Sequence, residues 1–180
     1  VMLGDTYARG AIVVAQTLKN VETRWPVWCM VTPDVSEECI EMLAYHFAKI
    51  VRVPLITKPV ASMRSKKQQQ IYGRWIQSSF TKWNIFNPEL FPVDKVMLID
   101  ADMLFLKNAD ELFDLPAPAA TFSSPWAQPY VMAKRGGAYN PYVINGHEMS
   151  HGDVVDPWRI VRGFKGSILG MACMVLVQPS

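Results

Sequence analysis

The sequence predicts an α/β fold, with a mostly parallel central sheet flanked by helices in a single domain of 180 residues. Two observations carry this prediction. Strand-like apolar runs alternate with amphipathic helical patterns through the first third of the chain, which is typical of parallel sheets. This alternation comes ahead of a loop-rich part of the chain, residues 123–170.

The first third of the chain is expected to hold two helices and two strands. Helical spacing of apolar residues indicates a helix over residues 7–19, and the residues on its apolar face are Ala11, Val14, Ala15 and Leu18. Residues 26–32 and 50–54 are short apolar runs, which favours buried strands.

The second helix is expected to begin after Ser36, which is a favourable N-cap residue. Acidic side chains favour the positive end of a helix, and here they are Glu37, Glu38 and Glu41. Its expected apolar face consists of Ile40, Leu43, Ala44 and Phe47.

The rest of the chain carries weaker signals. A helix is expected over residues 74–86, with an apolar face made of Ile76, Phe80, Trp83 and Phe86. Strands are expected over residues 95–99, 119–122 and 171–177, with a short helix or turn near 109–113. The polar stretch 58–70 and the Pro- and Gly-rich stretch 123–170 are expected to form loops, where functional contacts are common.

Composition excludes several classes of protein. Half of the residues are hydrophobic, but no apolar run approaches the roughly 20 residues of a membrane span. A net charge of +2 does not indicate a dedicated nucleic-acid-binding protein. The three cysteines form no C-x-x-C pair, which favours reduced thiols in a cytoplasmic protein. The opening residues resemble the end of a strand, and the chain stops just after an apolar run, so we expect that it lacks its first residues and a C-terminal part.

Charges are unevenly distributed along the chain. Residues 42–88 carry eight basic side chains and no acidic one, whereas residues 89–114 carry seven acids against two lysines. A ligand that combines phosphates with a divalent metal would suit this arrangement, because basic groups bind phosphate oxygens and carboxylates bind the cation. Two ordinary solvated faces would give the same pattern.

The most informative residues are Asp100, Ala101 and Asp102, which directly follow the apolar run 95–99. Carboxylates are costly beside apolar segments unless they are paired or bind a metal. Two carboxylates separated by one small residue can approach the same Mg²⁺ or Mn²⁺ ion, since these cations prefer oxygen ligands. A turn or helix cap made by either aspartate is the structural alternative.

The segment VMLIDADMLFLKNADELFDL resembles the metal-binding segment of the glycogenin-like retaining glycosyltransferases of family 8. Three further segments are similar to that family in the same order along the chain. They are GDTYARGAIVVAQTLK, SSFTKWNIF and ACMVLVQPS. Enzymes of this kind also occur in large DNA viruses. The resemblance implies a GT-A-like nucleotide-diphospho-sugar transferase fold that would span residues 1–180 as one incomplete domain.

The resemblance also implies an activity and a metal site. The enzyme would transfer a hexose from a UDP-sugar, with retention of anomeric configuration, to a glycan, protein or small molecule that the sequence does not identify. Asp100 and Asp102 would bind Mn²⁺ or Mg²⁺ at the donor diphosphate, and the metal would help UDP to depart by neutralising its developing charge.

The nucleotide contacts implied by the resemblance lie in several segments. Asp100 would also lie near the ribose, and the backbone of Ala101 would contact the nucleotide. Tyr7 would lie against the uracil ring, Lys82 would reach the donor, and Arg74 would contact the nucleotide. The base pocket would be bordered by Val1 and Leu3.

The chain also departs from the family pattern. Met171, Ala172 and Cys173 stand where the family often has a sugar-contacting amide, and Gly4 stands where it has a polar residue near the base. The family's C-terminal half, with a third metal ligand, is not present, so no catalytic residue is assigned. The missing amide at residues 171–173 favours the first alternative, a non-catalytic relative that binds nucleotide.

A rival motif is H-E-x-x-H at residues 147–151, the pattern of zinc hydrolases. That chemistry requires His147 and His151 one turn apart on a helix, with Glu148 as base. Neighbouring glycines and prolines argue against such a helix. The segment is otherwise expected to be an acceptor-side loop or plain surface.

Overall fold

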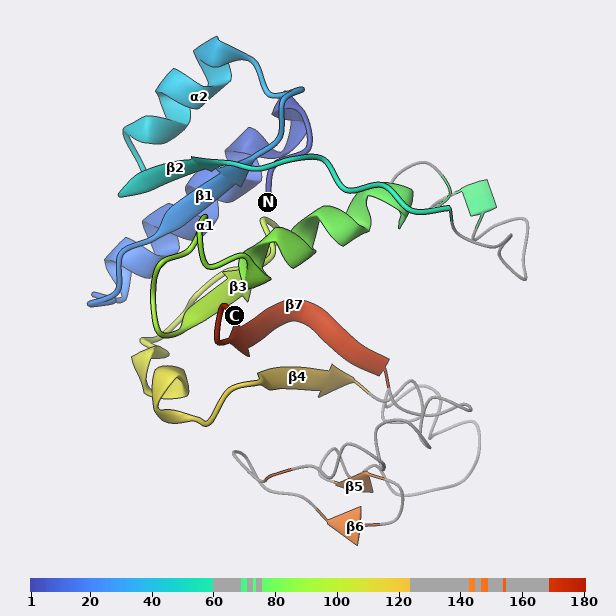
Figure 1. Cartoon of the computed structure of the whole chain (residues 1–180). Coiled ribbons are helices and arrows are strands. Elements are labelled where there is room, and N and C mark those ends of the chain that lie inside the picture. Colours follow the sequence, from blue (N-terminus) through green and yellow to red (C-terminus); the bar gives the residue numbers. More distant parts are fainter. Residues whose placement is uncertain are drawn as a thin grey trace.

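The computed structural model describes residues 1–59, 69–70, 73, 76–123, 143–144, 147–148, 154 and 169–180 (Figure 1). Its first part alternates helix and strand as expected. A 3₁₀ helix η1 (Asp5–Tyr7) leads into α1 (Ala8–Asn20). Strand β1 (Trp28–Val31), helix α2 (Glu37–Ala44) and strand β2 (Lys49–Arg52) follow. The strands β1 and β2 pair in parallel, and Met2 forms a parallel bridge to Val31 on the other edge of β1.

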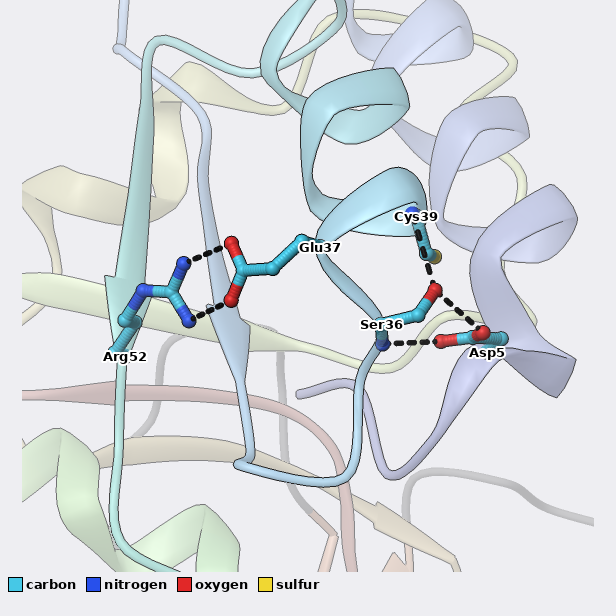
Figure 2. Close-up of polar contacts among 5 residues, drawn as sticks. All are labelled: Asp5, Ser36, Glu37, Cys39 and Arg52. Carbon is cyan, nitrogen blue, oxygen red and sulfur yellow. Dashed lines mark hydrogen bonds and ion pairs between the residues drawn. The ribbon is translucent and has the colours of Figure 1, made fainter.

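The start of α2 is capped in the expected way. The Ser36 hydroxyl oxygen accepts a hydrogen bond from the Cys39 N–H at 3.2 Å, and both the N–H and hydroxyl of Ser36 donate to Asp5 (Figure 2). These bonds hold the pKa of Asp5 below its ordinary value. The cap therefore also ties η1 to α2, two elements about 30 residues apart.

Two apolar clusters lie against β1. Alternate β1 side chains, Cys29 and Val31, pack with residues of α1 and α2. The intervening Met30 packs with residues of β2, η2, β3 and β7 in a second cluster. The expected face of α2 is correct at Ile40 and Leu43 but wrong at Ala44, which is exposed because α2 ends there.

Three later strands form a second sheet in the order β3, β7, β4. They are β3 (Val96–Ile99), β4 (Ala119–Ser123) and β7 (Leu169–Val177), and both pairings are antiparallel. The described strands thus pair in both senses, whereas the sequence predicted a mostly parallel sheet. The difference arises at β7, because an apolar run such as residues 171–177 does not encode the direction in which it enters a sheet.

The helix expected over residues 74–86 is instead a 3₁₀ helix, η2 (Ile76–Phe86). The expected apolar face is wrong at Trp83, which is 55% exposed, whereas Phe86 packs against the second cluster. The fully buried residues of η2 are Thr81, Asn84 and Ile85. Thr81 and Asn84 are buried because they satisfy backbone groups of the segment after β2. Thr81 exchanges hydrogen bonds with Ile56, and the Asn84 amide donates to the Pro54 carbonyl at 2.9 Å.

A third 3₁₀ helix, η3 (Asp110–Asp114), is held against the segment that follows α1. The Asp110 carboxylate accepts hydrogen bonds from the Thr23 hydroxyl at 2.5 Å and the Arg24 N–H at 2.9 Å. Two short strands, β5 (Val143–Ile144) and β6 (His147–Glu148), pair with each other. Among the described residues, no helix is long and apolar enough to cross a membrane.

Candidate functional site

The candidate site is the turn that directly follows β3. Strand β3 ends at Ile99, and the Asp100 N–H continues its ladder by donating to the Cys173 carbonyl of β7 at 2.9 Å. The chain then leaves the sheet through Ala101 and Asp102. Both carboxylates therefore lie at the carboxyl end of a strand, as the sequence predicted.

Asp100 is paired with Lys82, which lies on η2. The Lys82 ammonium nitrogen lies 2.5 Å from Asp100 Oδ1, and the side chains are 25% and 24% exposed, respectively. Because water screens such a pair only partly, the ammonium neutralises much of the Asp100 charge. The predicted donor-contacting lysine and the first predicted metal ligand are thus in direct contact.

Ala101 packs closely against α1. A Cβ added at Gly10 would lie nearer to the Ala101 carbonyl oxygen than the 3.0 Å below which Cβ contacts essentially do not occur. Only glycine allows the helix to approach the turn this closely. Sequence reasoning missed Gly10, because a glycine within an amphipathic helical pattern does not reveal what its open side faces.

Asp100 and Asp102 border different cavities. A cavity of about 830 Å³ lies between β1 and β3, and Asp100 is part of its lining. A smaller cavity of about 290 Å³ lies between α1 and the turn, and Asp102 borders it with Arg9 and Gly10. Ala101 borders both cavities, so the turn separates them.

The predicted base-pocket residues precede η1. Val1 lines the larger cavity. Leu3 is half-buried, whereas Tyr7 is 56% exposed at the end of η1. Arg74, the remaining predicted contact, lies outside the described residues.

Gly4, where the family has a polar residue, has a backbone conformation that side chains disfavour. Its φ is 66° and its ψ is −177°, a region that is essentially restricted to glycine. A residue with a side chain at position 4 would therefore be strained, because the backbone turns sharply between the Met2 bridge and η1.

The donor set of the turn fits a hard divalent cation only in part. Asp100 and Asp102 supply carboxylate oxygens, which Mg²⁺ and Mn²⁺ prefer. Within the described part of the chain, no group of three or more His, Cys, Asp or Glu residues is arranged to hold a metal. Phosphate oxygens and water would have to complete the coordination of a cation held by these two carboxylates.

The two residues of the rival zinc motif that the structure describes are not helical. His147 and Glu148 form β6, an extended strand paired with β5, whereas zinc hydrolase chemistry requires them on a helix. His151 lies outside the described residues.

Comparison with known proteins finds homologues over about two thirds of the chain, although no family model matches it. The chain is 31% identical over 130 residues to an uncharacterized protein of Acanthamoeba polyphaga mimivirus, covering 69% of this chain and 42% of that protein. It is 31% identical over 122 residues to UDP-glucuronate:xylan alpha-glucuronosyltransferase 2 of Arabidopsis thaliana, covering 68% and 19%. It is 30% identical over 122 residues to Glycogenin-1 of Caenorhabditis elegans, covering 68% and 27%.

These matches agree with the sequence resemblance, and they also limit what it shows. The chain spans less than half the length of each of these three relatives. One of them is a viral protein, in line with the expectation that similar proteins occur in large DNA viruses. The two of these relatives whose names state a function are a glycogenin and a xylan glucuronosyltransferase, and at about 30% identity they are homologues of this chain.

Proposed function

We propose that this chain is the nucleotide-binding part of a glycogenin-like glycosyltransferase, which transfers a hexose from a UDP-sugar to an acceptor. One observation carries the proposal. The turn of Asp100, Ala101 and Asp102 directly follows a strand, borders two cavities and contacts a lysine, in a chain whose named homologues include a glycogenin and a glucuronosyltransferase.

The residues of this chain would divide the work of binding the donor. Asp100 and Asp102 would hold Mn²⁺ or Mg²⁺, which supplies Lewis-acid stabilisation of the departing diphosphate when it is bound. Lys82 already lies against Asp100 and would add a positive charge near the phosphates. Val1 and Leu3 precede the sharp turn at Gly4 and would border the base, with Tyr7 against the uracil ring.

The transfer itself is proposed to retain the anomeric configuration, as in the family that the motifs resemble. The homologous plant protein is named for a UDP-glucuronate donor and a xylan acceptor. A UDP-linked donor sugar is therefore a consistent class for this chain, and its acceptor would be a glycan, a protein or a small molecule.

A second candidate, a relative that binds nucleotide without transferring sugar, is favoured by one feature of the sequence. Met171, Ala172 and Cys173 lie in β7, where the family often has an amide that contacts the sugar. Cys173 contributes its backbone carbonyl to the Asp100 turn instead. Such a protein would bind UDP and a metal but would release no sugar.

Calorimetric titration with UDP, with and without Mn²⁺, tests the proposal on this chain and on Asp102→Asn. Glu41→Gln, which changes an exposed carboxylate on α2, is the matched control. We expect metal-dependent binding that falls by at least about 100-fold in Asp102→Asn, because loss of outer-shell partners alone costs 10–100-fold. The Glu41→Gln variant should bind as the unaltered chain does.

Turnover separates the two candidates. Release of free sugar from a UDP-sugar, by this chain or by a form extended at its C-terminus, would support the transferase. Tight UDP binding without sugar release in the extended form would support the non-catalytic relative. Binding that is unaffected by both Mn²⁺ and Asp102→Asn would contradict the proposed metal site.

A further inference from the structure

The segment after the candidate turn follows α1 over most of its length. At the start of this segment, the Ala101 carbonyl lies against Gly10. Further along, the Phe105 N–H donates to the Thr17 hydroxyl at 3.3 Å. That hydroxyl donates its own proton to the Val14 carbonyl at 2.9 Å, so its oxygen is left to accept from Phe105. The segment and the helix therefore run side by side in the same direction.

The far end of the segment is tied to the end of α1. The Asn108 amide donates to the Val21 carbonyl at 3.0 Å and to the Glu22 carbonyl at 3.2 Å, just beyond the last turn of the helix. Asn108 Oδ1 also accepts from the Asp110 N–H at 2.8 Å, and the Asp110 carboxylate holds the next residues, as described above. The bonds to α1 and its end join residues at least 86 positions apart, so the fold and not the local sequence makes them.

The contacts lie on one stripe of the helix and leave the segment little slack. Gly10, Thr17 and Val21 follow one another at spacings of seven and four, which place them on the same side of α1. Gly10 and Thr17 are about 10 Å apart along the helix axis, at about 1.5 Å per residue. Residues 101–105 span about 13 Å when fully extended, so the part that carries Asp102 has only about 3 Å to spare.

Exposure alternates along this part of the chain, as in an extended strand. Met103 and Phe105 are half-buried, whereas the side chains of Asp102 and Leu104 are exposed. Because side chains of an extended segment point alternately to opposite sides, the bond from Phe105 to Thr17 sets the side on which Asp102 lies. A slip by one residue would turn the Asp102 carboxylate toward α1.

We propose that Thr17 and Asn108 are positioning residues of the candidate metal site, which hold the segment in register along α1 so that the Asp102 carboxylate points outward. Asp100 needs no such support, because β7 and Lys82 hold it. The Asp102 carboxylate forms no hydrogen bond or ion pair with the described part of the chain, so its direction depends on its backbone. The inference rests on the proposed function, since it takes Asp102 to be a metal ligand.

Three variants and one control test the proposal. Thr17→Val removes the hydroxyl that accepts from Phe105 and keeps the shape of the side chain, whereas Thr17→Ser keeps the hydroxyl. Asn108→Asp keeps an accepting oxygen but cannot donate to the carbonyls at the end of α1. Gln16→Ala, which removes an exposed hydrogen bond within the same helix, is the control.

Two measurements are made on each protein. The first is the order parameter of the Asp102 N–H from NMR relaxation, without any ligand, which is independent of the proposed function. The second is the Mn²⁺ affinity in the presence of UDP, from the EPR signal of free Mn²⁺, with Asp102→Asn as the reference for loss of the carboxylate. Urea unfolding shows which variants are folded, and Thr17→Val decides if Asn108→Asp is not.

We expect an order parameter of about 0.85 in the unaltered chain, Thr17→Ser and Gln16→Ala, and a fall below about 0.6 in Thr17→Val and Asn108→Asp. The Mn²⁺ affinity should fall by about 10-fold or more in the same two variants, as when outer-shell partners of a metal ligand are lost, and Thr17→Ser should restore it.

The two measurements separate this inference from the proposed function. An Asp102 N–H that stays rigid in Thr17→Val and Asn108→Asp would overturn the inference, whatever the site binds. A mobile Asp102 with unchanged Mn²⁺ affinity would also overturn it where Asp102→Asn lowers that affinity. If Asp102→Asn does not change the affinity, the proposed metal site is wrong, and a mobile Asp102 in the two variants would still support its positioning by Thr17 and Asn108.

Discussion

The two sides of the turn after β3 differ although their aspartates are only two residues apart. On the Asp100 side, the carboxylate is paired with Lys82, the N–H is bonded to β7, and the side chain is 24% exposed. On the Asp102 side, the residue is exposed and borders a small cavity next to α1. A motif that looks symmetric in the sequence therefore has one member built into the fold and one member at the surface.

This difference suggests a division of roles. A carboxylate that is held by a lysine and by the sheet is positioned before any ligand arrives, which lowers the entropic cost of binding. An exposed carboxylate contributes little to stability and is available to a ligand. Changes on the Asp100 side should therefore affect both folding and binding, whereas changes at Asp102 should affect binding alone.

Gly10→Ala is the strongest test of the packing between the turn and α1. The added side chain would meet Ala101, which lies between Asp100 and Asp102. The added Cβ meets a backbone carbonyl oxygen, which has little room to shift. We expect a loss of about 1–3 kcal/mol in the free energy of unfolding, as for other overpacked sites, and a parallel loss of UDP binding. Thermal unfolding and calorimetry measure the two effects.

Gln16→Ala, at an exposed position of the same helix, is the control. Ala is a better helix former than Gly, so a Gly→Ala change at a helix position with room for the Cβ normally stabilises the protein. An unchanged or raised Tm in Gly10→Ala would mean that the turn can move away from α1, and the close packing would then not constrain the site.

Some of these features follow from local sequence signals and others do not. The buried face of α1 and the Ser36 cap depend on neighbours within one or two helical turns, so periodicity and capping rules predict them. The buried polar face of η2 could not be predicted, because Thr81 and Asn84 bond to backbone groups about 25–30 residues away. The same holds for the direction of β7 and for the Gly10 contact, which depend on residues 75 to 91 positions apart in the chain.

Of the candidate site, the sequence predicted the acidic pair and its place at a strand end. It predicted Lys82 as a donor contact, but its pairing with Asp100 depends on how η2 lies beside β3. The donor contacts of Tyr7, Leu3 and Ala101 stay predictions, since they concern a ligand rather than the chain itself.

Asp100→Asn and Asp102→Asn compare the two sides directly. The Asp100→Asn change would leave the Lys82 ammonium partly buried without its charge partner, which should lower the free energy of unfolding by about 1–2 kcal/mol. The Asp102→Asn change should alter it by less than about 0.5 kcal/mol, as for other exposed positions. Urea unfolding of both variants measures the difference, and equal losses would contradict the division of roles.

Lys82→Met separates the pairing role of the lysine from its predicted donor contact. Without the ammonium, Asp100 would be open to a cation, so Mn²⁺ alone should bind several-fold more tightly than to the unaltered chain. UDP with Mn²⁺ should bind more weakly if the lysine contacts the phosphates. Calorimetry of each ligand gives both values, and weaker Mn²⁺ binding would show that Lys82 supports the carboxylate rather than competing for it.

The smallest effects are expected at the clamp of Asp5 and Ser36, which ties η1 to the start of α2 (Figure 2). Ser36→Ala should cost about 1 kcal/mol through loss of the cap, with Asp5→Asn costing less. Because the pKa of folded Asp5 lies below its ordinary value of 3.8, its contribution is present above that pH and is lost as the pH falls through the lowered pKa. The Tm difference between Asp5→Asn and the unaltered chain should therefore be present at neutral pH and vanish in strong acid. A difference that stays constant down to strong acid would mean that the Asp5 charge does not stabilise the clamp.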